Sequence, residues 1–227
     1  MSSDPIDTPP AEGFRQVRYA PPPGATVLLL VRHGASEPAH PDRPFPLVDG
    51  HGDPALDPVG EEQARLVGAR LATERVDAIY VTSLRRTHQT AAPLAAALGL
   101  TPIEERDLRE VHLGDWEGGL IRHKVAAGDP IALRMRAEER WDVIPGAEPY
   151  DVLTARTTAA VARIVAAHPG QRVVAVVHGG IIGHLLHLAA RSRPFAFNGA
   201  DNTSISELVI DGDTQVIRRF NDTVHLD

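Results

Sequence analysis

The chain has 227 residues, 43% of them hydrophobic, which is enough for one well-packed domain and scarcely for two. It contains no cysteine, so disulfides, cysteine-ligated metals and thiol nucleophiles are excluded. The formal net charge of −7 argues against a general nucleic-acid or anionic-membrane surface, so any anion binding must be confined to a local basic pocket.

Residues 1–24 are rich in proline and show no basic stretch followed by an apolar one, which is unlike a signal peptide. We expect a loosely ordered arm here, with packing along the domain surface through Phe14, Val17 and Tyr19 as the alternative. No apolar run approaches the ~20 residues of a membrane span. These features predict a cytoplasmic protein with one domain over residues 25–227.

From residue 25 onward, strand and helix patterns alternate, as is typical of βα units around a mainly parallel sheet. Strands are predicted at 27–31, 78–81, 102–105 and 173–177, with a terminal hairpin from 204–210 and 214–220. Helices are predicted at 59–72, from a Thr82 or Ser83 cap to 98, at 150–167 and at 179–190, with weaker helical signals between 120 and 140. Residues 37–58 are too polar and broken for a regular element and predict a long functional loop. The fold expected is an α/β three-layer αβα sandwich around a mainly parallel sheet, with an inserted, partly helical lid region.

Two histidines each follow one of the buried strands. Arg32-His33-Gly34 comes directly after 27–31, and His178 comes directly after 173–177. Because ligands bind at the carboxyl ends of strands in open α/β sheets, both imidazoles are expected in one crevice. The sequence therefore predicts catalysis at histidine.

Motifs in a fixed order carry a family resemblance. They are Arg32-His33-Gly34, the block 84–91 with Arg86, the segment 108–118 with Glu110 and Trp116-Glu117-Gly118, Val177-His178-Gly179-Gly180, and Asn202-Thr203-Ser204-Ile205. From about Val27 to Phe220 the chain resembles the histidine phosphatase superfamily, which includes cofactor-dependent phosphoglycerate mutases and many phosphatases. The resemblance implies a histidine phosphatase-like catalytic domain over residues 25–227, with no metal and no cofactor.

The chemistry of these residues can also be argued directly. A phosphate monoester carries about two negative charges, so a neutral imidazole that attacks phosphorus needs cations to screen the oxygens. Arg32 and Arg86 supply forked donors, and His178 adds a donor at a helix N-terminus. Ser36 and Gly179 are further phosphate-binding candidates. His33 is then the nucleophile.

By resemblance, the proton donor for the leaving group lies in the segment 108–118, and Glu110 fits its spacing to Gly114 and Trp116-Glu117-Gly118. Neighbouring acidic residues compete for the role: Glu104, Glu105, Asp107, Asp115 and Glu117.

Several residues have a plainer interpretation. Arg85 is expected at the surface, pointing away from the crevice, and Trp116 is expected to be a packing anchor. His184 and His187 are expected to be satisfied or exposed helix histidines rather than metal ligands. Many family members place a phosphate-contacting asparagine shortly after Arg-His-Gly, but the stretch 35–40 has none. Whether His40 or a backbone group replaces it is left open.

The function expected is hydrolysis of a small phosphorylated metabolite through a phosphohistidine, because the segment 113–118 resembles the phosphatase branch. The first alternative is a cofactor-dependent phosphoglycerate mutase, whose basic lid could come from Arg122, Lys124, Arg134, Arg136 and Arg140. A non-catalytic module that binds phosphate ligands is the second. The partner expected is a small phosphorylated substrate, with no nucleic acid and no membrane, and a homo-oligomer is left open.

Overall fold

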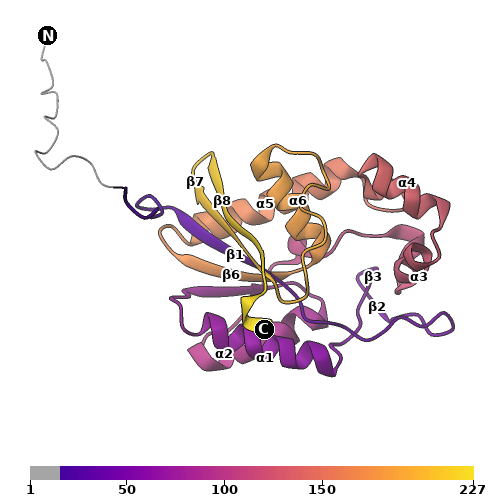
Figure 1. Cartoon of the computed structure of the whole chain (residues 1–227), viewed down its shortest axis with the longest axis horizontal. Helices are drawn as coiled ribbons and strands as arrows, with labels where there is room; N and C mark the ends of the chain where they lie inside the picture. Colours follow the sequence, from indigo (N-terminus) through magenta and orange to yellow (C-terminus); the bar gives the residue numbers. More distant parts are fainter. Residues whose placement is uncertain (1–15) are drawn as a thin grey trace, which may run out of the picture.

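The computed structural model describes residues 16–227, and its centre is a six-stranded sheet with the strand order β5-β4-β6-β1-β7-β8 (Figure 1). The strands are β1 (Thr26–Arg32), β4 (Ala78–Val81), β5 (Ile103–Glu104), β6 (Arg172–Val177), β7 (Ile205–Asp211) and β8 (Thr214–Asp222). The pairs β5–β4, β4–β6 and β6–β1 are parallel, whereas β7 and β8 join in antiparallel fashion. The mainly parallel sheet predicted from the sequence is confirmed.

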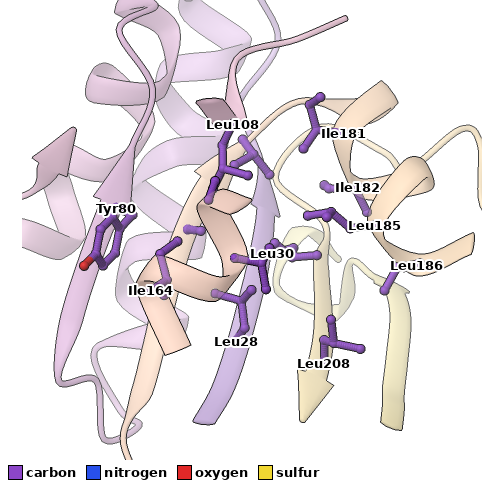
Figure 2. Close-up of a cluster of buried hydrophobic side chains, with 14 of the residues drawn as sticks. Leu28, Leu30, Tyr80, Leu108, Ile164, Ile181, Ile182, Leu185, Leu186 and Leu208 are labelled. Atoms are coloured by element: carbon purple, nitrogen blue, oxygen red, sulfur yellow. The ribbon is translucent and has the colours of Figure 1, made fainter. Parts of the chain in front are cut away.

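Helices cover both faces of this sheet. The helices α1 (Pro58–Leu71) and α2 (Arg85–Leu98) lie on one face, and α5 (Tyr150–Ala167) and α6 (Gly179–Ala190) lie on the other (Figure 1). Leu28 and Leu30 of β1 belong to the core under α5 and α6, whereas Leu29 belongs to the core under α1 and α2. In the first core, Ile164 of α5 and Leu185 of α6 gather around Leu28 and Leu30 (Figure 2). Because both faces are covered, β1 is a continuous apolar run, and the three-layer αβα fold is confirmed.

Local signals set the helix ends. The Asp57 carboxylate accepts a hydrogen bond from the Gly60 amide at 2.7 Å and caps α1, which begins at Pro58. Gly99 closes α2 in the left-handed region, with φ 65°. The cap predicted at Thr82 or Ser83 is wrong, because Leu84 occupies the N-cap position and makes no side-chain cap bond. The Thr82 hydroxyl lies instead within hydrogen-bonding distance of His178 in the candidate site.

The sequence predicts no regular element in the segment 37–58, and this prediction is wrong. The segment contains two antiparallel two-residue strands, β2 (Leu47–Val48) and β3 (His51–Gly52). Asp49 and Gly50 connect them with positive φ angles of 49° and 82°. An Asp-Gly pair with both residues at positive φ is the usual two-residue hairpin turn, and this local signal outweighs the polar composition. The hairpin brings His51 to the edge of the candidate site.

The insert between β5 and β6 is partly helical, as predicted. It contains α3 (Leu120–Ala126) and α4 (Pro130–Glu138), which lie beyond one end of the sheet (Figure 1), and the short 3₁₀ turns Arg106–Leu108, Gly114–Trp116 and Trp141–Val143. Trp116, Ala132, Met135 and Ile144 form a small core of its own. The role of this insert as a lid stays a prediction.

Near the start of the described chain, Tyr19 lies against the sheet. The guanidinium of Arg218 in β8 lies 3.9 Å from the centroid of the Tyr19 ring, whereas Val17 is exposed. Phe14 lies outside the described residues, and the division into 1–24 and 25–227 stays a prediction. Within residues 16–227, no helix has the length and apolar character needed to cross a membrane.

Candidate active site

The parallel pairing of β1 with β6 brings the two histidines together. Arg32, at the end of β1, is in register with Val177, at the end of β6, so the residues that follow both strands are neighbours. The rings of His33 and His178 lie 5.2 Å apart, centroid to centroid, in an edge-on arrangement. Both side chains are buried. The structure thus brings the two imidazoles together, but His33 lines the pocket described below, whereas His178 is fully buried and is not among its lining residues.

His33 is held in one tautomer. Its Nδ1 lies 2.7 Å from the Gly34 carbonyl oxygen, to which it donates, so the Nε2 atom keeps its lone pair. Burial, followed by the charges of Arg86 and Arg32, lowers the pKa of His33 well below its ordinary value. The ring is therefore neutral at neutral pH, which is the form that can attack phosphorus.

The glycine after His33 has a steric role. A Cβ atom on Gly34 would lie 2.6 Å from the carbonyl oxygen of Gly60 in α1, which is closer than real Cβ contacts. The Gly34 amide donates to the Thr90 hydroxyl of α2 at 3.0 Å. The Arg-His-Gly turn is thus fixed against both helices on this face of the sheet, and this fixes the direction of the His33 ring.

Arg86 reaches the same point from the first turn of α2. Its Nη1 donates to the Gly52 carbonyl at 2.9 Å, and its Nη2 lies 3.2 Å from Nδ1 of His178. The side chain is buried, which lowers its pKa to about 10, while the charges of Glu110 and then Asp53 oppose this shift. It stays a cation at neutral pH. Arg85, by contrast, is half exposed and donates to Asp53, as expected for a surface residue.

His178 is buried between Arg86 and Thr82. Its Nδ1 accepts from Nη2 of Arg86, which can only donate, so the neutral ring carries its proton on Nε2 and donates it to the Thr82 hydroxyl at 3.1 Å. Burial and the charge of Arg86 lower the pKa of His178 well below its ordinary value, so the ring is neutral. In this tautomer, Nδ1 of His178 holds the Arg86 guanidinium, and the ring's own N–H is used by Thr82.

Arg32 completes the cationic side of the site. Its Nη1 donates to the Ala200 carbonyl at 2.6 Å, and burial lowers its pKa. Within residues 16–227, the Nε atoms of both Arg32 and Arg86 are buried without a hydrogen-bond partner. A buried donor without an acceptor costs about 1–3 kcal/mol, so these two N–H groups are poised for an anionic ligand.

Glu110 faces the two arginines. Its Oε1 accepts from the Val111 amide at 2.9 Å, and its Oε2 accepts from the Gly180 amide at 3.2 Å. The Glu110 charge raises the pKa of Arg32 and of Arg86, against the effect of burial. Glu110 lines the same pocket as His33, and so does the competing carboxylate Glu117. Both oxygens of Glu117 accept backbone amides as well, those of Leu113 and Gly52, so these contacts do not distinguish the two carboxylates.

The pocket lined by His33, Arg32, Arg86 and Glu110 has a volume of about 260 Å³, which suits a small ligand. Its cationic residues are Arg32, Arg86 and Arg122, and its apolar wall includes Phe45, Val111, Leu113, Trp116, Ile121 and Trp141. Trp116 is also a buried anchor of the insert core, as expected.

Of the five basic residues considered for a mutase lid, Arg122 alone is among those that line the pocket. Lys124, Arg134 and Arg140 instead form ion pairs within the insert itself.

The weaker phosphate-binding candidates occupy different positions. Gly179 is the first residue of α6 and lies against Arg32, because a Cβ on it would contact the Arg32 side chain at 3.4 Å. The Ser36 hydroxyl accepts from Nη2 of Arg122 at 2.7 Å, so it holds an arginine of the pocket. His40 lines a separate hollow with Arg43 and Pro44, away from His33. The side chain that stands near Ser36 in the region of the missing asparagine is Arg122.

Residues that the sequence did not single out complete the surroundings. His51, from the β2–β3 hairpin, lines the pocket, and its Nε2 lies 3.1 Å from the Glu110 carbonyl. Burial lowers the pKa of His51, whereas the hydrogen bond with the Asp49 carbonyl acts in the opposite direction. The neutral ring has one N–H group, which it donates to the carbonyl of either Asp49 or Glu110. The Asp49-Gly50 turn is the one sequence signal that could have placed it. Arg156, from α5, reaches the backbone around Glu110, and no local pattern predicts this contact.

His184 and His187 on α6 are satisfied helix histidines, as expected. Nε2 of His184 lies 3.2 Å from the Thr154 hydroxyl, and Nε2 of His187 lies 2.9 Å from the Tyr150 hydroxyl. Both side chains are buried.

A three-layer fold in which two neutral, buried histidines lie beside Arg32 and Arg86 is typical of a protein that handles phosphate groups. The family model agrees, and the chain belongs to the histidine phosphatase superfamily (branch 1), which matches residues 28–223. The chain is 37% identical over 207 residues to phosphoglycerate mutase-like protein 4 of Arabidopsis thaliana, covering 88% of this chain and 86% of the relative. It is 32% identical over 202 residues to phosphoserine phosphatase 1 of Hydrogenobacter thermophilus, covering 88% and 93%. Among solved structures, a mycobacterial glucosyl-3-phosphoglycerate phosphatase superposes with a TM-score of 0.74 and 26% identity, covering 88% of this chain and all of that one.

Proposed function

We propose that the protein hydrolyses the phosphate monoester of a small metabolite, with His33 as the nucleophile and without a metal or cofactor. The observation that carries this proposal is the pair of buried, unpartnered Nε–H groups of Arg32 and Arg86 beside the free Nε2 lone pair of His33. Donors without acceptors next to a neutral nucleophile are the arrangement that a phosphoryl group satisfies.

Binding of the substrate phosphate uses the cationic side of the pocket. Arg32 and Arg86 each present a buried N–H group, and Nδ1 of His178 accepts from Nη2 of Arg86 and holds that guanidinium in place. Gly179 adds the backbone amide at the start of α6, where the helix dipole favours an anion. Together these donors screen the phosphate charge and hold phosphorus in front of His33.

In the first chemical step, the Nε2 lone pair of His33 forms a bond to phosphorus as the ester P–O bond breaks. The leaving oxygen takes a proton from Glu110. In the second step, a water oxygen attacks phosphorus, the N–P bond breaks back to His33, and the Glu110 carboxylate accepts the water proton. An alcohol and inorganic phosphate leave, and both side chains return to their initial state.

Two relatives support hydrolysis over the mutase alternative, because phosphoserine phosphatase 1 and the glucosyl-3-phosphoglycerate phosphatase are both named as phosphatases. The pocket supports it too, since only Arg122 among the five basic residues considered for a lid lines it. The non-catalytic alternative is disfavoured, because a pure binding site has no use for a carboxyl group like that of Glu110 in the same pocket as the nucleophile.

The test is metal-independent hydrolysis of 4-nitrophenyl phosphate in the presence of a chelator. We expect turnover in the wild type and a loss of about 10³-fold or more in His33→Ala. His88→Ala, an exposed histidine on α2, is the matched control and retains activity. Brief incubation with labelled substrate followed by alkaline quenching is expected to trap label on His33. Undiminished turnover in His33→Ala would overturn the proposal.

The mutase alternative has its own measurement. With 3-phosphoglycerate and 2,3-bisphosphoglycerate present, we expect release of free phosphate to outpace formation of 2-phosphoglycerate. The opposite order identifies a mutase. The cytoplasmic location, the absence of nucleic-acid partners and the oligomeric state stay predictions from the sequence.

A further inference from the structure

Arg156 on α5 makes an unusual set of contacts for a residue outside the pocket. Its Nη1 donates to the carbonyl oxygens of Asp107 and Arg109, at 2.6 and 2.9 Å, and its Nη2 donates to the Glu110 carbonyl at 3.0 Å. Three carbonyl groups in a stretch of four residues therefore converge on one guanidinium. Its side chain is only 16% exposed.

Glu148 holds this guanidinium in place. Its Oε1 and Oε2 accept from Nε and Nη2 of Arg156 at 2.6 and 2.8 Å, which is the bidentate geometry that fixes the plane of the arginine. Glu148 is also tied to the chain after Glu110, because its amide donates to the His112 carbonyl at 2.9 Å. The Arg156–Glu148 pair is thus hydrogen-bonded to the backbone both before and after Glu110.

The segment around Glu110 needs such support because it has little regular structure. A 3₁₀ turn ends at Leu108, and the next begins at Gly114, so Glu110 lies in the irregular stretch between them. Within residues 16–227, its own carboxylate is held by the Val111 and Gly180 amides. Those bonds orient the carboxyl group. The Arg156–Glu148 pair fixes the position of the main chain that carries the Glu110 side chain.

We propose that Arg156, fixed by Glu148, is a positioning residue for the proton donor Glu110. This inference rests on the proposed hydrolysis at His33. Arg156 touches neither His33 nor the phosphate-binding groups in the contacts of the described chain, so it acts through the placement of Glu110. A displacement of about 1 Å at a reacting group can cost up to about 10²-fold in rate.

The position of Glu110 matters only where the leaving group needs a proton. Esters of poor leaving groups, such as alkyl phosphates, depend on general acid catalysis, whereas activated aryl esters scarcely do. Loss of the Arg156–Glu148 pair is therefore expected to slow an alkyl phosphate far more than 4-nitrophenyl phosphate. A general loosening of the site slows both equally and weakens binding of inorganic phosphate.

The experiment compares Arg156→Lys, Arg156→Gln and Glu148→Gln with the wild type. Lysine keeps the charge but loses the fork that reaches three carbonyls. We expect kcat/KM for glycerol phosphate to fall about tenfold to hundredfold, with less than about a threefold change for 4-nitrophenyl phosphate. The inhibition constant of inorganic phosphate is expected to stay within about twofold, because its ligands are untouched.

Arg163→Gln is the matched control. Arg163 lies two helical turns further along α5 and pairs with Glu105 and Asp107, but its guanidinium is half exposed. Exposed ion pairs contribute about 0–1 kcal/mol, so this variant is expected to leave both substrates unchanged.

Equal losses for the two esters, or an unchanged ratio in all three variants, overturn the inference. If Arg156→Gln fails to fold, Glu148→Gln and Arg156→Lys decide it by the same ratio. Failure of the proposed function is distinguishable, because it appears as undiminished turnover in His33→Ala, whatever the Arg156 variants do.

Discussion

Gly180 and Glu110 are in direct contact across 70 residues of sequence. The Gly180 amide, in the first turn of α6, donates to Oε2 of Glu110 at 3.2 Å. A Cβ atom at position 180 would lie 2.5 Å from Oε1 and 3.2 Å from Cδ of the same carboxyl group. The second glycine of His178-Gly179-Gly180 therefore makes room for the proton donor, in addition to forming the turn into α6.

Gly180→Ala is expected to displace the Glu110 carboxyl group while leaving the phosphate ligands in place. Because the contact is with the end of a side chain, the protein is expected to fold. We expect kcat/KM for an alkyl phosphate to fall about 10²-fold, approaching the loss in Glu110→Gln, with a much smaller change for 4-nitrophenyl phosphate. The steady-state kinetics of both esters check this, and Gly179→Ala, whose Cβ meets Arg32 instead, is the comparison. A loss in Gly180→Ala that does not depend on the leaving group contradicts it.

Arg86 and Arg85 are adjacent and offer a paired test of phosphate binding. Arg86 is buried and divides its donors between the Gly52 carbonyl and the pocket, which a lysine ammonium cannot do from one point. Arg86→Lys is expected to lower kcat/KM about 10²-fold for alkyl and aryl esters alike, because charge on the phosphate oxygens must be screened for either leaving group. Arg85→Lys, at a half-exposed side chain, is expected to change it by less than about threefold. Comparable losses in the two variants count against the role of Arg86.

The sequence predicts the two histidines because their signal is local. An apolar run that ends in His33 and another that ends in His178 need no knowledge of the tertiary structure beyond the rule that strand ends bind ligands. Helix boundaries follow from similarly local signals, such as Asp57-Pro58 before α1 and Gly99 after α2.

Glu110 and its supports are harder to predict, because they depend on contacts between distant segments. The choice of Glu110 among its acidic neighbours came from the family resemblance, and its partners Gly180 and Arg156 lie 70 and 46 residues away. Periodicity cannot reveal a side chain that binds the backbone of a remote irregular segment. The misplaced cap at Thr82 has a related cause, since Thr82 fits the local rule for a helix cap but its hydroxyl is used by His178.

Arg122 is expected to act on substrate binding rather than on the chemical step. It lies at the edge of the pocket, 5.3 Å from the Phe45 ring centroid, and it forms no ion pair with a carboxylate of residues 16–227. Arg122→Gln is expected to raise KM about 5- to 20-fold, with kcat within about threefold. The reason is that the variant loses an interaction that stabilises the bound substrate and the transition state equally. The increase is expected to be larger for a phosphate ester that carries a second anionic group. Lys124→Gln, on the same helix but paired with Asp129, is the control, and a fall in kcat without a rise in KM argues against this role.

His184 is expected to make stability depend on pH. Burial, with smaller effects from His187 and Arg156, lowers its pKa to about 4, so the folded protein keeps the ring neutral while the unfolded chain binds a proton near its ordinary pKa of 6.5. The contribution of the neutral His184 ring to the free energy of unfolding is therefore fully present above pH 6.5 and is lost as the pH falls toward 4. Between pH 7 and 5 we expect the free energy of unfolding to fall by about 2 kcal/mol through His184 alone. Urea titrations at both pH values check this, with His184→Gln losing that part of the difference and His40→Gln, at an exposed site, retaining it. An equal pH dependence in wild type and His184→Gln contradicts the assignment.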